Sequence, residues 1–71
     1  MNPVNPKKLL HSKWTAVTPA NREKHFSVVE VHDDEAGHPV TCVLQAAHSG
    51  NHYKLAWRDL KDSTAWRIGW R

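Results

Sequence analysis

Four tryptophans have to find places in a chain of only 71 residues that contains one Phe and one Tyr. A chain of this size buries only about 60% of the surface that it exposes when unfolded, and each buried Trp accounts for roughly 150–250 Å². The tryptophans are therefore the largest units that the core must accommodate. Four such rings are hard to bury completely in so small a body, so we expect most of them in the core and at least one partly exposed.

The length fits a single domain. We expect an N-terminal arm over residues 1–12 and one small β domain over residues 13–71. Cys42 is the only cysteine, which excludes an internal disulfide and a cysteine-based zinc site and suits a reducing compartment. No apolar run has the length of a signal peptide or a membrane span, so the sequence favours a cytoplasmic location.

Short segments rich in β-branched and aromatic residues alternate with turn-forming residues along the chain. The period-two pattern of a strand is clearest where Tyr53, Leu55 and Trp57 share one phase. For the strand expected near Val28, the pattern does not show which residues face inward, because Val28 and Val29 are adjacent and point to opposite faces. The expected strands are 14–17, 26–31, 38–47 (or 40–47), 52–58 and 65–71.

The segments between these strands carry helix and loop signals. Asn5-Pro6 is a helix-start pattern and predicts one helical turn over residues 7–11, after four frayed residues. A polar loop is expected over residues 20–24, and a tight turn of 3₁₀ type is expected over residues 59–62.

Five short strands joined by tight turns predict an all-β fold, a small five-stranded antiparallel SH3-like barrel with a short N-terminal helical turn. The one-turn helix expected just before the last strand favours the SH3-like comparison, which is an analogy. An OB-like barrel is the alternative, although the chain is short for it.

Charge is unevenly distributed, although the net charge is only +3. Residues 1–25 carry five basic side chains and one acidic one, and residues 48–71 carry five basic and two acidic ones. Residues 26–47 carry four acidic side chains and no Lys or Arg. The two basic ends would form one basic face if the termini lie together, and the acidic middle would then point elsewhere.

Tryptophans that lie beside basic residues are the candidates for a binding surface. A partly exposed Trp next to a cation offers a stacking platform for a base, a proline or a cation, and Arg or Lys could contact phosphates. The ordinary alternative is that the tryptophans pack in the core and the charges are solvated. Trp70 is the first candidate and Trp14 the second, and the full set of candidate binding residues is Trp14, Trp70, Lys13, Arg58, Arg67 and Arg71.

Little in the sequence points to catalysis or to a cofactor. The His48–His52 and His32–His38 pairs flank two turns and could hold a metal weakly, but no spacing supplies the three or four ligands of a zinc site. Cys42 lies on the apolar phase of a strand, where a buried thiol is ordinary, and no phosphate loop or nucleophile motif is present. We expect surface histidines, no metal site, no cofactor and no enzyme.

Three tryptophan-rich segments carry a family resemblance. The segments NPKKLLHSKWTAV, REKHF and WRDLKDSTAWRIGW resemble the small tryptophan-rich family of uncharacterised bacterial proteins. The resemblance runs from Asn5 to Trp70, and residues 31–51 add nothing to it. The family has no assigned activity, so the resemblance implies no catalytic or binding residue.

Three functional hypotheses follow from these patterns. The first is a non-enzymatic module that binds protein or peptide through exposed aromatic side chains, because SH3-like barrels dock extended peptides on aromatic-lined grooves. The alternative is single-stranded nucleic acid, with Arg and Lys on phosphates and Trp stacked on bases. Metal handling by the histidines is a distant third. We expect no membrane partner and a monomer or weak dimer, since exposed edge strands can pair.

Overall fold

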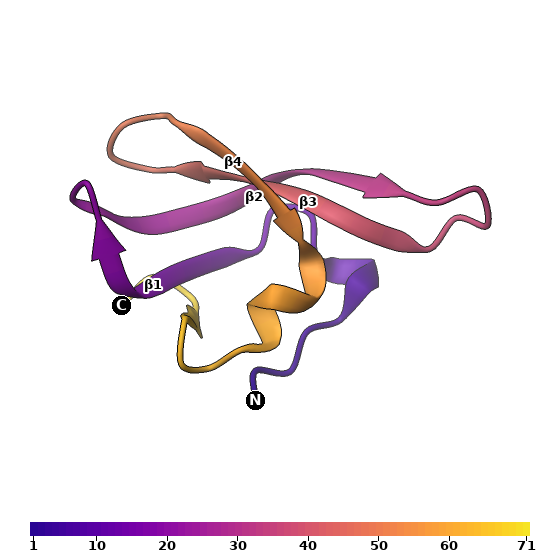
Figure 1. Ribbon diagram of the computed structural model, residues 1–71, viewed down its shortest axis with the longest axis horizontal. Helices are drawn as coiled ribbons and strands as arrows, with labels where there is room; N and C mark the ends of the chain where they lie inside the picture. The colour runs from indigo at the N-terminus through magenta and orange to yellow at the C-terminus, as the bar shows by residue number, and fades with distance from the viewer.

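The computed structural model describes all residues from 1 to 71, and its architecture is mainly β. Five strands form one antiparallel sheet in the order β4-β3-β2-β1-β5, and the only helical pieces are two short 3₁₀ turns (Figure 1). No helix is long and apolar enough to cross a membrane. The elements are η1 (Pro6–Lys8), β1 (Lys13–Ala20), β2 (Glu23–Asp33), β3 (Pro39–Ala46), β4 (His52–Ala56), η2 (Trp57–Lys61) and β5 (Trp66–Ile68).

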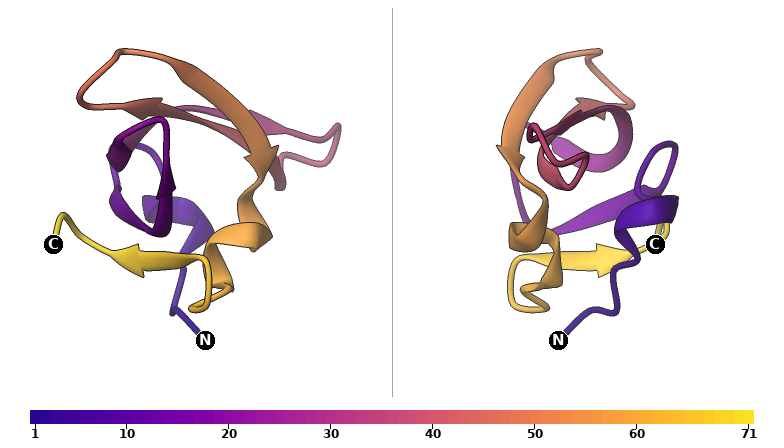
Figure 2. Two further views of the ribbon diagram at one scale, coloured as in Figure 1. Left: turned by 60° about the vertical axis from the view of Figure 1, so that its left-hand side comes forward. Right: turned by 90° about the vertical axis from the view of Figure 1, so that its right-hand side faces the viewer.

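The predicted five-stranded antiparallel fold is confirmed, but the strands do not close on themselves. Backbone pairing ends at β4 on one side and at β5 on the other. The sheet is strongly curled, so that β5 lies across the interior from β3 and β4 (Figure 2). The sheet is therefore open, and a closed SH3-like barrel stays a prediction. We call the unpaired gap between β4 and β5 the open seam.

The hairpin between β1 and β2 turns on only two residues. Ala20 pairs with Glu23, and the two residues between them, Asn21 and Arg22, have φ of 55° and 63°. Positive φ at both central positions is the backbone of a type I′ turn, which matches the twist of paired strands. The expected polar loop over residues 20–24 is therefore wrong, because the strands continue to the turn itself.

A break in the pairing of β1 with β2 accompanies the curl of the sheet. Between the Thr15–His25 and Ala20–Glu23 pairs, four residues of β1 lie opposite one residue of β2. Beyond Thr15, β1 leaves β2 but continues to pair with β5, with Ala16 opposite Trp66. A strand that is irregular on one edge bends and twists more strongly, so β1 joins the main sheet to β5.

A second irregularity explains why the pattern around Val29 cannot be assigned from sequence. Val28 pairs with Leu44, but Glu30 pairs with Val43, so β2 holds one extra residue at Val29. Because of this bulge, Val28 and Val31 both face inward although they are three residues apart. Val28 is fully buried, and Val31 packs against the core. Strict alternation fails here because a bulged strand does not keep period two.

The core combines residues from every part of the chain. Two of the four tryptophans are in it, and their indole N–H groups are satisfied: Trp14 Nε1 donates to Ser12 Oγ at 2.9 Å and Trp57 Nε1 donates to the Pro39 carbonyl at 2.8 Å. The buried apolar cluster comprises Leu9, Trp14, Phe26, Val28, Cys42, Leu44, Ala46, Trp57 and Leu60.

The N-terminal arm is packed against the sheet. Asn5 caps η1 as expected, with its Oδ1 accepting from the Lys7 amide at 3.0 Å, but the turn spans residues 6–8 and not 7–11. The expected fraying of the first four residues is wrong. The Asn2 side chain donates to the carbonyls of Leu60 and Trp66 at 2.9 and 2.7 Å, because η2 and β5 leave these acceptors free.

The C-terminal strand is shorter than expected. The pattern predicts a strand over residues 65–71, whereas β5 covers only residues 66–68. Gly69 has a φ of 80°, a conformation that ends an extended strand and that glycine adopts without steric cost. The fourth strand also ends earlier, at Ala56, since Trp57 already begins η2.

The two-residue turn generates a stability prediction. Replacing Arg22 by glycine should raise the free energy of unfolding by up to about 1 kcal/mol, because a non-glycine residue pays a steric cost at positive φ. The control Lys24→Gly, in the neighbouring strand, should lower the free energy of unfolding by about 0.5–1 kcal/mol. Urea unfolding followed by Trp fluorescence measures both. Equal losses in the two variants would contradict the assigned turn.

Candidate functional site

Trp70 lies on the outer surface of the sheet, where it is 46% exposed. After Gly69 the chain crosses β1: the Gly69 amide donates to the Lys13 carbonyl at 2.8 Å, and the Arg71 amide donates to Thr15 Oγ1 at 2.9 Å. The Trp70 indole donates to the Phe26 carbonyl at 2.8 Å. The ring is therefore held in a fixed orientation with part of its surface open to solvent.

Basic side chains surround this ring. Lys13 Nζ lies 4.3 Å from the Trp70 ring centroid, and the His25 ring stacks on it at 5.6 Å and 30°. Thr15 pairs with both His25 and Arg67, and residues directly opposite in an antiparallel ladder share one face. We call this surface, formed by Lys13, His25, Arg67, Trp70 and Arg71, the Trp70 face.

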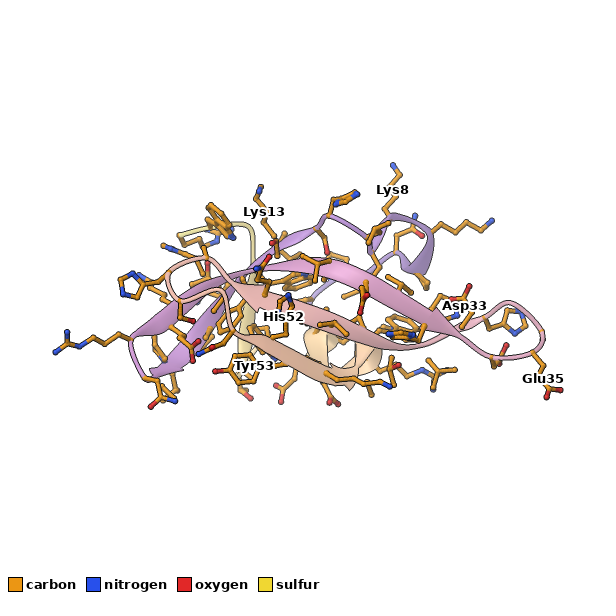
Figure 3. The ribbon with its side chains drawn as sticks, turned by 90° about the horizontal axis from the view of Figure 1, so that it is seen from above. Lys8, Lys13, Asp33, Glu35, His52 and Tyr53 are labelled. Carbon is orange, nitrogen blue, oxygen red and sulfur yellow. The ribbon has the colours of Figure 1, made fainter.

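The acidic middle of the sequence lies away from the Trp70 face, as expected. Figure 3 places Asp33 and Glu35 toward the far end of the long β2–β3 hairpin, whereas Lys13 projects from the upper edge, left of the centre of the view. The acidic residues near this hairpin end therefore lie apart from Lys13 of the Trp70 face.

Four of the six predicted binding residues gather on the Trp70 face, and two do not. Trp14 is only 3% exposed, so the expectation that it offers an exposed ring is wrong. It pairs with Phe26 on the inward face of the sheet, opposite its neighbour Lys13. Arg58 belongs to η2, where its guanidinium lies 5.7 Å from the Trp57 ring, and it does not join the Trp70 face.

A second site lies at the open seam and was not predicted. An apolar groove of about 470 Å³ opens there, and eight of its twelve lining residues are hydrophobic. A larger hollow of about 990 Å³ lies between the N-terminal arm and the β2–β3 turn, but only five of its fourteen lining residues are hydrophobic. The smaller groove has the composition of a binding site, which is mostly apolar with a few polar groups.

Three aromatic rings form one wall of this groove. The Phe26 ring meets the Trp66 ring at 5.3 Å and 82°, and it meets the Tyr53 ring at 6.0 Å and 71°. Both contacts have the edge-to-face geometry that aromatic rings favour. Phe26 is buried, Trp66 is half-buried, and Tyr53 is 41% exposed.

A buried carboxylate lies beside this wall. Glu23 is only 4% exposed. Its Oε2 accepts hydrogen bonds from Ser49 Oγ and Asn51 Nδ2, and its Oε1 accepts one from the Tyr53 hydroxyl. These bonds, that from Ser49 first and those from Tyr53 and Asn51 with it, hold the pKa of the carboxyl below its ordinary value of 4.5. The carboxylate is therefore ionised at neutral pH.

We name this second site the Glu23 groove; its lining includes Ala16, Glu23, Phe26, Tyr53, Leu55 and Trp66. The sequence patterns did not predict it, because Glu23 was expected in a polar loop and Ser49 lies in the turn between His48 and His52, 26 residues further along the chain. One signal was present in the sequence, since Glu23 is the only acidic residue among the first 25.

The remaining reactive side chains do not form a site of their own. Cys42 is fully buried, and burial first, with the charge of Asp59 second, raises the pKa of its thiol to about 11. The thiol is thus protonated at neutral pH, which is the unreactive form. No group of three or more His, Cys, Asp and Glu side chains is placed to hold a metal ion.

Mutation can distinguish the buried Trp14 from the half-exposed Trp70. Trp14→Ala should lower the free energy of unfolding by about 3–5 kcal/mol, because it empties the core. Trp70→Ala should lower it by less than about 2 kcal/mol, because it removes a half-exposed ring and one hydrogen bond. Urea unfolding and amide NMR dispersion measure the difference. Comparable unfolding of both variants would mean that Trp70 is a core residue.

Glu23 should make stability depend on acid pH. Because its folded-state pKa is depressed, its contribution is present above pH 4.5 and is lost as the pH falls through the folded-state value. Urea midpoints measured from pH 7 down to pH 3 should fall more steeply for the wild-type protein than for Glu23→Gln. The control Glu35→Gln, at an exposed position, should follow the wild type. Parallel profiles for all three proteins would contradict this role of Glu23.

Comparison with known proteins identifies a family and no relative of known activity. No curated protein matches this chain, and no solved structure matches it. The family described as Tryptophan-rich protein (DUF2389) matches residues 12–71, which include both surfaces described above but not the η1 segment of the sequence resemblance. The chain therefore belongs to this tryptophan-rich family, whose function is unknown.

Proposed function

We propose that this protein is a non-enzymatic module that binds an extended peptide segment of a protein partner in the Glu23 groove. The observation that carries the proposal is an apolar groove with an aromatic wall at the one place where the sheet is open. Grooves of this composition dock extended segments through side-chain pockets and main-chain hydrogen bonds.

The open seam favours an extended guest over a compact one. β4 and β5 each have one edge without a neighbouring strand, and an unpaired edge offers backbone donors and acceptors to an incoming strand. A peptide lying along β4 would place alternate side chains against Leu55 and Tyr53, which line the groove. In this arrangement the peptide lies between β4 and β5, the two strands that would pair with each other in a closed barrel.

We also propose that the fold is related in its architecture to SH3-like barrels. Such barrels use aromatic-lined grooves for peptides, and the curled five-stranded sheet with a 3₁₀ turn before its last strand supports the likeness. We further propose that the protein works as a monomer or weak dimer, without a cofactor or a membrane partner.

Selection from a randomised peptide library tests the proposal. The wild-type protein should enrich a set of related peptides. Ala65→Gln, which extends a polar side chain from an exposed residue of the groove wall, should bind these peptides at least tenfold more weakly without disturbing the core. The matched control Ala36→Gln changes an exposed alanine in the β2–β3 turn and should bind like the wild type.

Chemical shifts then locate the selected peptides on the protein. Each peptide should move the amide signals of Tyr53 and Leu55 and the indole signal of Trp66. A library that enriches nothing, or peptides that bind Ala65→Gln as tightly as the wild type, would exclude the Glu23 groove as a peptide site.

A specific observation favours single-stranded nucleic acid as a second candidate ligand, on the other surface. Lys13 lies over the half-exposed Trp70 ring, and Arg67 and Arg71 belong to the same face. Such ligands use this combination of cations for the phosphates and an aromatic ring for stacking. Three phosphate contacts would give a salt slope near −2, so affinity should fall about 15- to 20-fold between 50 and 200 mM salt.

Fluorescence titration with a short oligonucleotide at the two salt concentrations measures this slope. Arg67→Gln should weaken binding and reduce the slope by about 0.7. Arg58→Gln, which removes an equal charge outside the Trp70 face, is the matched control. Binding that is independent of salt, or equally weakened by both substitutions, would remove this candidate.

A further inference from the structure

We infer that the Glu23 groove selects a basic side chain of its peptide, with the ammonium of Lys or the guanidinium of Arg placed against the Glu23 carboxylate. This inference rests on the proposed function, and it adds the chemistry of the residue that the groove recognises. It follows from the charge of the groove, from an unused acceptor position in it, and from the way in which the other tryptophans are covered.

The Glu23 carboxylate is a buried anion without a cation. Its three hydrogen-bond donors, from Ser49, Asn51 and Tyr53, are all neutral. His48 is near enough to lower the pKa of the carboxyl but forms no ion pair with it, and the single ion pair of the protein joins Glu30 and His32 at 3.6 Å. Buried charges are normally paired, so this groove is electrostatically complementary to a cationic guest.

The carboxylate also keeps a place for one more donor. An ionised carboxylate offers about four acceptor positions on its two oxygens. Oε2 accepts from two side chains, whereas Oε1 accepts only from the Tyr53 hydroxyl. Tyr53 lines the groove, so the free position belongs to the oxygen that is bonded to a groove residue. An N–H group of Lys or Arg can fill it with a charge-assisted hydrogen bond.

The aromatic wall suits the rest of a basic side chain. Phe26, Tyr53 and Trp66 meet at steep angles, so they present ring faces and edges in more than one direction. Ring faces attract cations, and the methylene stem of Lys or Arg packs on apolar surface while its charged end reaches a polar group. A neutral aliphatic side chain would use the wall but leave the carboxylate unpaired.

The surroundings of the four tryptophans also favour a cationic guest. Trp70 is covered by Lys13 at 4.3 Å, and Trp57 is covered by Lys61 at 5.2 Å and by Arg58. Trp14 is buried. Trp66 is the only partly exposed tryptophan that no cation of this chain covers, and it lies in the groove that holds the unpaired carboxylate.

Matched pentapeptides test the inference on the unmodified protein. We would titrate ¹⁵N-labelled protein at pH 7 with blocked peptides that have Lys, Arg, norleucine or Glu at the centre of four alanines. Norleucine keeps the apolar stem of Lys and lacks its charge. The Lys and Arg peptides should shift the Trp66 indole and Tyr53 amide signals and bind at least tenfold more tightly than the norleucine peptide, and the Glu peptide should not bind.

Two variants assign the selectivity to the carboxylate. Glu23→Gln should bind the Lys and norleucine peptides with equal affinity. The matched control Glu35→Gln removes an equal charge at an exposed position outside the groove, so it should retain the preference for Lys. The comparison of Lys with norleucine decides the matter on the wild-type protein even if Glu23→Gln does not fold.

The outcomes separate this inference from the proposed function. Equal binding of the Lys and norleucine peptides in the groove would overturn the selection of a basic side chain and leave a peptide groove in place. No shift in the groove up to millimolar peptide, or shifts confined to the Trp70 face, would also overturn it. In that case the library selection alone decides whether the groove binds peptides.

Discussion

The break in the pairing of β1 with β2 is the constraint on which the rest of the structure depends. A single strand pairs with β2 through Trp14 and Thr15 and also with β5 through Trp14, Thr15 and Ala16. The stretch that bends away from β2 folds the sheet over its own inner face, and one small cluster of apolar residues can then fill the space. The same bend sets the distance between β5 and β4, so it also produces the open seam and the groove.

The four tryptophans are divided between the core, the Trp70 face and the Glu23 groove. Trp14 and Trp57 are buried with their indole donors satisfied, and no buried side-chain nitrogen or oxygen atom lacks a partner. Trp70 ties the C-terminal residues to β2 through the Phe26 carbonyl, while Trp66 contributes to the groove wall. A protein of this size thus uses the same residue type for packing, for fastening a terminus and for lining a cavity.

Sequence patterns predicted the elements well where local residues decide the structure. The alternation of Tyr53 and Leu55, the Asn5 cap and the 3₁₀ turn before the last strand are local features, and all are present. The turn at Asn21 was missed because Arg22 rarely adopts positive φ, and the bulge at Val29 was missed because pairing with a distant strand creates it.

The candidate site shows the same limit more strongly. The exposure of Trp70 was predicted, since a ring near the chain end and next to Arg71 has little to bury it, whereas its contact with Lys13 was not. The burial of Trp14 depends on its pairing with Phe26, which no local pattern specifies. The Glu23 groove joins residues from five strands and the two tips of separate hairpins, so its existence follows only from the folded topology.

The unequal edges of the sheet have a consequence for the behaviour of the protein at high concentration. β5 offers only three residues before Gly69 turns the chain away, and β4 carries His52 and Lys54 as exposed side chains. Short edge strands and charged edge residues are the means by which natural sheets avoid pairing edge to edge and aggregating. The chain can therefore leave its seam unpaired and still resist polymerisation, which a long apolar edge at the same place would not allow.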